Sequence, residues 1–203
     1  VKKSLMKVRI VVNGVGAAGG ATVRLLEFMG VEDILALDSQ GVLYQGRQNM
    51  DWSKKELAEM TNKKRLKGGL KEVVKGADVF VGLSAPGVLK PEMVRSMARN
   101  AIVFAMANPV PEIMPEEAVR VGAAVVATGR SDYPNQLNNA LVFPGLFRGL
   151  LGSAKKQISM EMKVGVVEAL AGLVEKPIRE EIIPTVFDRR VVPAVAKAVR
   201  CCS

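Results

Sequence analysis

The chain has 203 residues, of which 49% are hydrophobic, and it carries a formal charge of +9 at pH 7. Its length suits one domain, with or without an appendage, and its apolar content excludes a largely disordered protein. It contains no histidine, which excludes serine–histidine and cysteine–histidine nucleophile pairs and histidine-bound zinc within these residues. The two cysteines, Cys201 and Cys202, are adjacent and predict no disulfide framework.

The first segment predicts a strand, a glycine-rich turn and a helix. Residues 8–12 form a short β-branched run, and apolar positions recur at helical spacing over residues 17–28. Between them Gly14, Gly16 and Gly19 follow the G-x-G-x-x-G spacing. In a dinucleotide site the first glycine permits the tight turn, the second leaves room for the pyrophosphate, and the third lets the helix pack on the strand. Unpaired N–H groups at the start of the helix then bind phosphate.

A second apolar run, at residues 34–37, ends in Asp38. A dinucleotide site places an acid about 20 residues past the glycines, where it accepts hydrogen bonds from the adenosine ribose. Such a carboxylate would repel a 2′-phosphate, so it favours NAD over NADP. Arg47, in the following loop, is a cation that would weaken this preference. The alternative interpretation makes Asp38 an ordinary turn residue at a strand end.

Residues 39–50 are polar and contain glycine, which predicts a loop. The next helix has two candidate caps, Asp51 and Ser53, and Ser53 with Glu56 matches a capping box. Further helices and strands alternate beyond it. Helices are predicted over 54–60, 70–75 and 92–99 and from Pro115, and strands over 78–83, 101–105 and 123–128.

Strands that alternate with helices and are apolar on both faces predict a parallel sheet covered on both sides. We therefore expect a doubly wound, Rossmann-like α/β fold, with the whole chain, residues 1–203, forming one NAD(P)-binding domain. The core sheet is expected over about residues 6–150 and a helical tail that packs on it over 151–203. Helical segments are predicted over 146–151, 159–174 and 191–199.

In such sheets the ligand lies beyond the carboxyl ends of the strands. This rule brings several loops together at one edge of the predicted sheet. They are residues 14–19, Asp38 with Ser39, residues 84–87, Asn108 with Pro109, residues 129–132 and the amide-rich stretch 134–139. An asparagine before proline is also a common turn former, so Asn108 taken alone fits either interpretation.

Three long segments resemble the NAD-binding half of malic enzymes of the compact prokaryotic kind. Their sequences are VVNGVGAAG at 11–19, FAMANPVPEI at 104–113 and ATGRSDYPNQLNN at 127–139, the last followed by Phe143-Pro144-Gly145. The resemblance runs from Val8 to about Val199, nearly the whole chain. It is more specific than the glycine spacing because the matching segments are long and occur in order.

The resemblance implies a role for each matching residue. Malic enzymes oxidise L-malate with NAD(P), decarboxylate the oxaloacetate on Mg or Mn and protonate the enolate to pyruvate. By this resemblance Asn108 lies near the nicotinamide and malate, and Asn139 contacts the substrate carboxylate. The implied cofactor-binding residues are Gly14, Val15, Gly16, Ala17, Ala18, Gly19, Asp38, Ser39, Ser84, Ala85 and Asn108.

The sequence also departs from the family pattern. Malic enzymes carry their catalytic tyrosine and lysine and their acidic metal ligands in an upstream domain, whereas seven residues precede Val8 here. Tyr44 and Tyr133 do not fall in the catalytic motifs. We therefore expect no catalytic residue and no metal ligand in this chain, with Mg or Mn held by the other domain. The chain alone is expected to bind NAD without converting malate.

Two other functions remain as alternatives: the NAD(P)-binding domain of an amino-acid or folate dehydrogenase, and a non-catalytic NAD-binding module. Nucleic-acid binding has weak support, because the basic residues are interspersed with acids and the densest basic cluster, 63–67, has no aromatic side chain for base stacking. No apolar stretch is long enough to span a bilayer, and the N-terminus lacks a secretory signal. We expect a cytoplasmic protein without a membrane or nucleic-acid partner, and the resemblance implies a homodimer or larger assembly.

Overall fold

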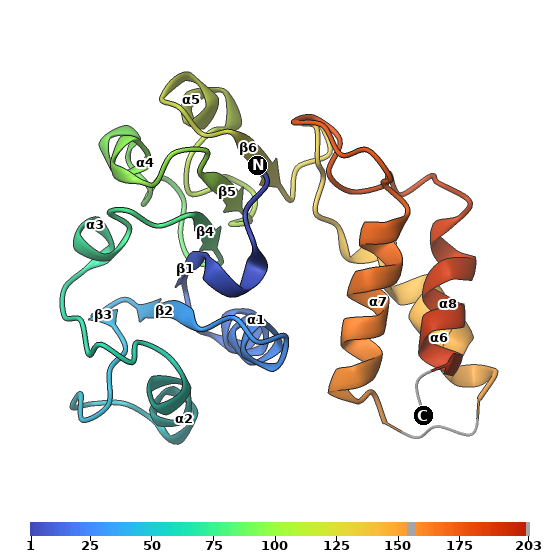
Figure 1. Cartoon of the computed structure of the whole chain (residues 1–203), viewed down its shortest axis with the longest axis horizontal. Helices are drawn as coiled ribbons and strands as arrows, with labels where there is room; N and C mark the ends of the chain where they lie inside the picture. The colour runs from blue at the N-terminus through green and yellow to red at the C-terminus, as the bar shows by residue number, and fades with distance from the viewer. Residues whose placement is uncertain (154–156, 202–203) are drawn as a thin grey trace. The chain divides into compact units, whose positions relative to one another are not determined.

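The computed structural model describes residues 1–153 and 157–201 (Figure 1). The chain divides into two compact units, Val1–Arg130 and Ser131–Ser203, which are described separately below. The predicted boundary between sheet and helical tail was near residue 150, so the first unit ends earlier than expected. Cys201 is a free, exposed thiol, and Cys202 lies outside the described residues.

The first unit contains a six-stranded sheet in the order β3-β2-β1-β4-β5-β6. Five strands are parallel, which confirms the predicted doubly wound fold, and β3 pairs antiparallel with β2 at one edge. The prediction of an unbroken loop over 39–50 is wrong at this point, because two of its residues form β3. The strands are β1 (Arg9–Asn13), β2 (Asp33–Asp38), β3 (Gly41–Val42), β4 (Val79–Gly82), β5 (Ile102–Ala105) and β6 (Val125–Thr128).

The parallel strands are in register, so β1, β4, β5 and β6 end at the same level and β2 runs one residue further, to Asp38. Asn13 of β1 is paired with Leu37 of β2 and with Gly82 of β4. Gly82 is paired with Ala105 of β5, which in turn is paired with Thr128 of β6. The chain reverses its direction of winding between β1 and β4, and such a switch point is where doubly wound sheets bind ligands.

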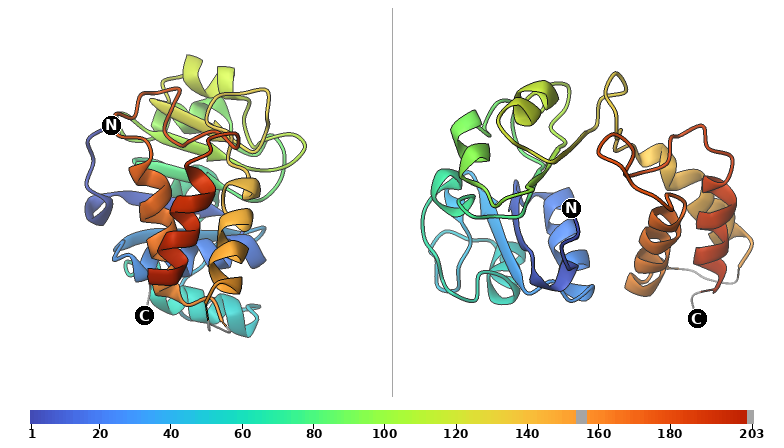
Figure 2. Two further views of the ribbon diagram at one scale, coloured as in Figure 1. Left: turned by 90° about the vertical axis from the view of Figure 1, so that its right-hand side faces the viewer. Right: turned by 45° about the horizontal axis from the view of Figure 1, so that its top comes forward.

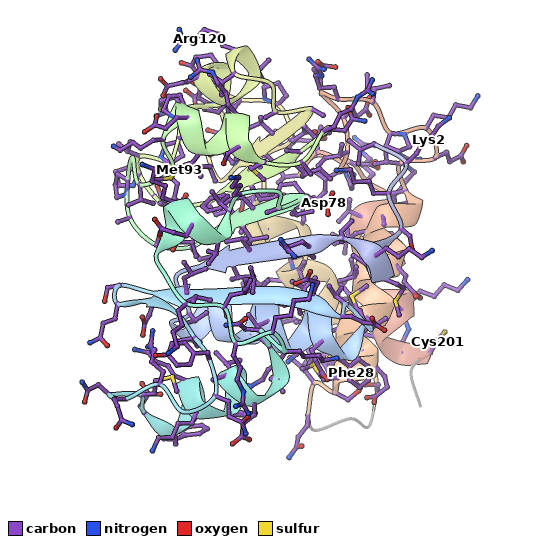
Figure 3. All side chains as sticks on the ribbon, turned by 60° about the vertical axis from the view of Figure 1, so that its left-hand side comes forward. Lys2, Phe28, Asp78, Met93, Arg120 and Cys201 are labelled. Atoms are coloured by element: carbon purple, nitrogen blue, oxygen red, sulfur yellow. The ribbon has the colours of Figure 1, made fainter. Side chains whose placement is uncertain are left out.

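Helices cover both faces of this sheet. Buried residues of α1 and α2 belong to one hydrophobic cluster with Ile10, Val12 and Ile34. Buried residues of α3, α4 and α5 belong to a second cluster with the alternate strand residues Val11 and Leu35. Met93 of α4 and Phe28 of α1 accordingly lie on opposite sides of the sheet (Figure 3). The helices are η1 (Leu5–Lys7), α1 (Ala17–Phe28), α2 (Trp52–Met60), α3 (Leu70–Val73), α4 (Pro91–Ser96) and α5 (Pro115–Arg120).

The start of α2 differs in part from the prediction. Asp51 is the cap, because its Oδ1 accepts the N–H of Lys54 at 2.9 Å. The predicted capping box of Ser53 with Glu56 is wrong. Both side chains instead accept hydrogen bonds from Arg24 of α1, at 3.1 Å to Ser53 Oγ and 2.5 Å to Glu56 Oε2. These bonds fasten the two helices that share one face of the sheet.

The second unit is helical. Its elements are η2 (Asn139–Leu141), α6 (Phe143–Leu151), α7 (Met160–Gly172) and α8 (Val191–Cys201), and the last three lie side by side (Figures 1 and 2). Helix α6 packs closely on α8 because glycines face it. A Cβ on Gly145 would lie 2.6 Å from Val195 Cβ, and one on Gly149 would lie 2.7 Å from Val199 Cβ. Among the described residues, no helix has both the length and the apolarity needed to cross a membrane.

Candidate functional site

The turn after β1 is held in place by its own backbone. Gly14 has φ of +104°, and a Cβ on it would lie 2.3 Å from the carbonyl oxygen of Leu83. The N–H groups of Gly14 and Val15 both donate to the carbonyl oxygen of Leu37, at 2.9 and 3.1 Å. The expectation that Gly14 must adopt a conformation favoured by glycine is confirmed. Val15 is buried and its N–H is engaged, so it shapes the turn and offers no free donor to a ligand.

Helix α1 begins at this turn and presents its N-terminus to solvent. The first hydrogen bond of the helix joins the N–H of Gly20 to the carbonyl oxygen of Gly16, at 2.8 Å. The N–H groups ahead of it, on Gly16, Ala17, Ala18 and Gly19, therefore have no acceptor within the helix. A Cβ on Gly16 would have nothing within 4 Å. Gly16, Ala17 and Ala18 are exposed and Gly19 is buried, so the helix start offers accessible donors at the positive end of the helix dipole, which suit an anion.

Gly19 serves a different purpose from Gly16. A Cβ on Gly19 would lie 2.0 Å from the carbonyl oxygen of Gly14, which is shorter than any non-bonded contact. Only glycine at this position lets α1 lie so close to the end of β1, as the sequence predicted. Two of the three predicted glycine functions are therefore confirmed. The third, room for a pyrophosphate beside Gly16, stays a prediction supported by the open space there.

A cavity of about 340 Å³ lies at the carboxyl ends of β1, β2 and β4. It brings together five residues that the sequence assigned to cofactor binding: Gly14, Asp38, Ser39, Ser84 and Ala85. Gly69 and Leu70, at the start of α3, are among its other lining residues. The sequence did not indicate that Gly69 and Leu70 contribute to the site, because α3 follows a long irregular segment and carries no recognisable motif.

Asp38, which lines this cavity, is tied to two cations that are not among its lining residues. Arg47 donates from Nη1 to Oδ1 at 2.9 Å and from Nη2 to Oδ2 at 2.5 Å, and Lys54 Nζ lies 3.0 Å from Oδ2. The N–H of Gln40 completes the set at 2.9 Å from Oδ1. Burial alone would raise the pKa of Asp38, but the hydrogen bonds from Arg47 and Lys54 outweigh it and lower the pKa to about 2. Asp38 is therefore ionised at neutral pH, and its acceptor positions are filled.

The sequence anticipated Asp38 and Arg47 but not Lys54. Lys54 lies in the first turn of α2, and its pairing with Asp38 depends on how the 45–50 loop returns the chain to the sheet. The side chain of Arg47 is only 8% exposed, and among the residues that the structure describes its Nε is a buried side-chain nitrogen without a hydrogen-bond partner. Arg47 is therefore a fixed part of the site rather than a mobile surface side chain.

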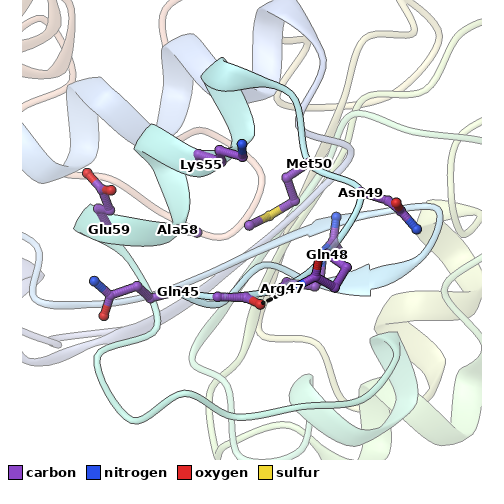
Figure 4. A pocket seen from close by; sticks show the side chains of 9 residues that line it. Gln45, Arg47, Gln48, Asn49, Met50, Lys55, Ala58 and Glu59 are labelled. Atoms are coloured by element: carbon purple, nitrogen blue, oxygen red, sulfur yellow. Dashed lines mark hydrogen bonds between the residues drawn. The ribbon is translucent and has the colours of Figure 1, made fainter.

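A second cavity, also of about 340 Å³, opens between the 45–50 loop and helix α2 (Figure 4). Arg47 lines it, while the guanidinium of the same residue is bonded to Asp38 in the first cavity. Lys55 and Glu59 of α2 form part of its wall. The loop that carries Arg47 thus has open space on one side and the candidate ribose position on the other.

Stability should depend on the protonation of Asp38. Its pKa is about 2 in the folded chain against an ordinary value of 3.8, so ionisation stabilises the fold above pH 4, and this contribution is lost as the pH falls towards 2. Asp38→Asn lacks the ionisable group, so its free energy of unfolding should fall less with acid than that of the wild type. We expect the advantage of the wild type to be larger at about pH 6 than at about pH 2, by at most about 2 kcal/mol. Urea unfolding of both proteins across this range measures it, and a difference independent of pH would contradict the assignment.

The two predicted asparagines lie outside the cavity lining, as do residues 15–19 at the start of α1. Asn108 follows β5 in the first unit and is exposed, and its peptide bond to Pro109 is cis. Since β5 is paired in register with β4, Asn108 and Ser84 are on adjacent loops at the same edge of the sheet. Asn139 is exposed at the start of η2 in the second unit, so its predicted contact with a substrate stays a prediction.

The acidic and cysteine side chains of the described residues are not clustered. Within them, no three carboxylate or cysteine side chains gather closely enough to hold a metal ion, and the sequence has no histidine. The side chains at the candidate cavity instead suit a ligand with an anionic centre and hydroxyl groups. Backbone N–H groups at the start of α1 could bind an anion, and a charged carboxylate flanked by cations lies at the end of β2.

Comparison with known proteins gives a consistent result. The sequence model of the family described as "Malic enzyme, NAD binding domain" matches residues 1–202. The bifunctional malic/malolactic enzyme of Bacillus subtilis (strain 168) is 54% identical over 200 residues, covering 97% of this chain and 49% of that protein. The NADP-dependent malic enzyme of Escherichia coli (strain K12) is 43% identical over 222 residues, covering 98% of this chain and 29% of that protein.

A solved structure shows the same similarity in three dimensions. The NAD-dependent malic enzyme of Thermotoga maritima superposes with a TM-score of 0.94 at 44% identity, covering 98% of this chain and 53% of that one. The chain therefore spans about half the length of two of these proteins and less than a third of the other.

Proposed function

This chain belongs to the malic enzyme family, in which it is the NAD-binding domain, and we propose that it binds NAD and orients the nicotinamide for the oxidation of L-malate. One arrangement supports this function above all. The open N-terminus of α1, the ionised Asp38 and the Ser84–Ala85 turn meet at the switch point of the sheet, within or beside one cavity. That arrangement matches the shape of an extended dinucleotide with a central diphosphate.

In the proposed binding mode the diphosphate rests on the N–H groups of Gly16 to Gly19, and the adenosine ribose lies at Asp38. The four hydrogen-bond donors that already contact Asp38 occupy the acceptor positions of its two carboxylate oxygens. A ribose hydroxyl that binds there must therefore displace a donor. Lys54 is the most suitable to leave, because its side chain is 29% exposed whereas that of Arg47 is 8% exposed.

The nicotinamide end is proposed to lie along Ser84 and Ala85 and to reach Asn108. Bound NAD supplies the hydride acceptor for malate oxidation. The part played by this chain is orientation, since fixing two reacting groups in one geometry removes much of the entropic barrier to their reaction. Asn139 is proposed to bind the malate carboxylate, as the family resemblance implies.

We propose that NAD is preferred over NADP. The negative charge of Asp38 disfavours a 2′-phosphate, but Arg47 and Lys54 reduce that repulsion. The names of the relatives include both NAD-dependent and NADP-dependent malic enzymes, so membership of the family does not decide between the two cofactors. The preference is therefore expected to be moderate.

Isothermal titration of the chain with NAD, NADP and ADP-ribose tests the binding function. We expect NAD to bind with a Kd below about 1 mM, NADP to bind more weakly, and no pyruvate to form from malate in the presence of NAD and Mn²⁺. Absence of binding by all three nucleotides would contradict the proposed function. Formation of pyruvate by this chain alone would show that acid–base groups for the reaction are present within it.

Assembly into a homodimer or larger oligomer is also proposed. Helix α6 exposes an apolar row, with Phe143 and Phe147 stacked at 5.9 Å between ring centroids and Leu151 89% exposed. An exposed apolar row of this kind is typical of a protein contact surface. Sedimentation equilibrium of the chain measures its oligomeric state directly, and a monomer at all concentrations would contradict self-association through this chain.

A further inference from the structure

Glu112 is a fully buried acidic residue that the proposed binding mode does not use. It follows β5 in the segment that contains Asn108. Its Oε1 accepts the N–H of Ser84 and its Oε2 accepts the N–H of Ala107, each at 2.9 Å. One carboxyl group therefore joins the loop after β4 to the loop after β5. These are the two loops to which the proposed function assigns the nicotinamide.

The fold provides a space for this carboxyl group. Gly82 ends β4, and a Cβ on Gly82 would lie 2.4 Å from Glu112 Cδ. Any larger residue at the end of β4 would displace the carboxyl group from the two N–H groups it binds. Main-chain bonds reinforce the same connection, since Gly87 donates to the carbonyl of Pro111 at 3.1 Å and Leu89 donates to that of Glu112 at 3.0 Å.

The connection extends to the first strand. Asn13, the last residue of β1, donates from Nδ2 to Ser84 Oγ at 2.7 Å. The ends of β1, β4 and β5 are therefore linked through Ser84, with Glu112 at the centre of the links between β4 and β5. A buried carboxyl group is costly unless it is hydrogen-bonded, so loss of either bond disfavours the arrangement as a whole.

We propose that Glu112 is a positioning residue, which holds the Ser84–Ala85 turn and the Ala107–Asn108 segment at the spacing that the nicotinamide requires. This inference rests on the proposed function and goes beyond it, because it assigns the spacing of the two loops to one buried side chain. It also predicts that a change at Glu112 weakens binding of the nicotinamide and leaves binding of the rest of the dinucleotide intact. The diphosphate and the adenosine ribose bind at α1 and Asp38, neither of which Glu112 contacts through the bonds described above.

Glu112→Gln separates this role from a purely structural one. An amide has one acceptor oxygen and one NH₂ donor, so it can accept the N–H of only one loop and turns a donor towards the other. Affinities for NADH and for ADP-ribose, which lacks the nicotinamide, are measured on the full chain by titration. We expect the ratio of NADH affinity to ADP-ribose affinity to fall about tenfold, with ADP-ribose affinity almost unchanged. The nicotinamide fluorescence of bound NADH should change in parallel.

Asp78→Asn is the matched control. Asp78 precedes β4 at the amino ends of the strands, opposite the candidate site. There its Oδ2 accepts the N–H of Arg9 at 2.8 Å and its Oδ1 lies 2.6 Å from Lys3 Nζ. It undergoes the same change from carboxylate to amide and also loses bonds that join chain segments. We expect Asp78→Asn to lower the melting temperature and to leave the ratio of NADH to ADP-ribose affinity unchanged.

The possible outcomes are distinct. Equal losses of affinity for both ligands in Glu112→Gln, or no loss for either, would overturn the positioning role. Equal affinities of the wild type for NADH and ADP-ribose would also overturn it, although dinucleotide binding would stand. Failure of the wild type to bind either ligand would refute the proposed function itself. Should Glu112→Gln not fold, Glu112→Asp gives the same test, because it keeps the acid but shortens its reach by one methylene.

Discussion

Asp38→Asn is expected to shift the cofactor preference of this chain towards NADP. The substitution removes the negative charge but leaves Arg47 and Lys54 beside the ribose position. These cations would then be available to a 2′-phosphate, and charge-assisted hydrogen bonds are typically worth about 1.5–3 kcal/mol. We expect the ratio of NADP affinity to NAD affinity to rise about ten- to a hundredfold.

Titration of each variant with both nucleotides measures this shift, and repeating it at higher salt should reduce it, because the gain is electrostatic. Asp51→Asn is the matched control. It carries the same change of charge on the cap of α2, where asparagine is an equally good capping residue, and its side chain is exposed. The control should leave the preference unchanged. An unaltered preference in Asp38→Asn would mean that this acid does not face the ribose.

Gly16→Ala is expected to abolish most NAD binding without destabilising the fold. The added methyl group would meet no protein atom within 4 Å, so the melting temperature should change little. It would, however, occupy the space beside the N–H groups that the diphosphate is proposed to contact. We expect NAD affinity to fall at least about a hundredfold, which corresponds to about 3 kcal/mol.

Gly19→Ala provides the contrast for this experiment. Its methyl group would lie 2.0 Å from the carbonyl oxygen of Gly14, so α1 must move and the protein should unfold at lower temperature. Thermal unfolding and NAD titration of both variants separate a glycine needed for the ligand from one needed for packing. Wild-type NAD affinity in Gly16→Ala would show that the diphosphate does not rest on this turn.

Much of the first unit could be predicted from the sequence because its signals are local. Buried parallel strands are continuous apolar runs, and each predicted strand is present in the structure. The glycine spacing and the acid at the end of β2 are equally local patterns. The strand β3 was missed because two residues in a polar loop carry no periodicity, and its pairing depends on β2 being in place.

The remaining features of the site depend on contacts between distant residues. Lys54 reaches Asp38 across 16 positions of sequence, and Glu112 reaches Ser84 across 28, so no local pattern reveals either contact. Gly82 would have been a useful clue for Glu112, since a glycine inside a buried strand often marks the close approach of another group. The first unit ends at Arg130, whereas the sequence predicts a core sheet to about residue 150, because the amide-rich stretch after Arg130 resembles one more loop of the sheet.

The ends of β1, β4 and β5 are level and β2 ends one residue later, so the loops that follow these strands can diverge independently of one another. Each of these loops begins at the carboxyl end of its own strand, so lengthening or replacing one loop does not move the starting points of the others. Deleting a single residue within a strand would instead withdraw its loop by about 3.3 Å and invert the faces of every following side chain. We therefore expect the loops at this edge to tolerate exchange, whereas an insertion or deletion within a strand should not be tolerated.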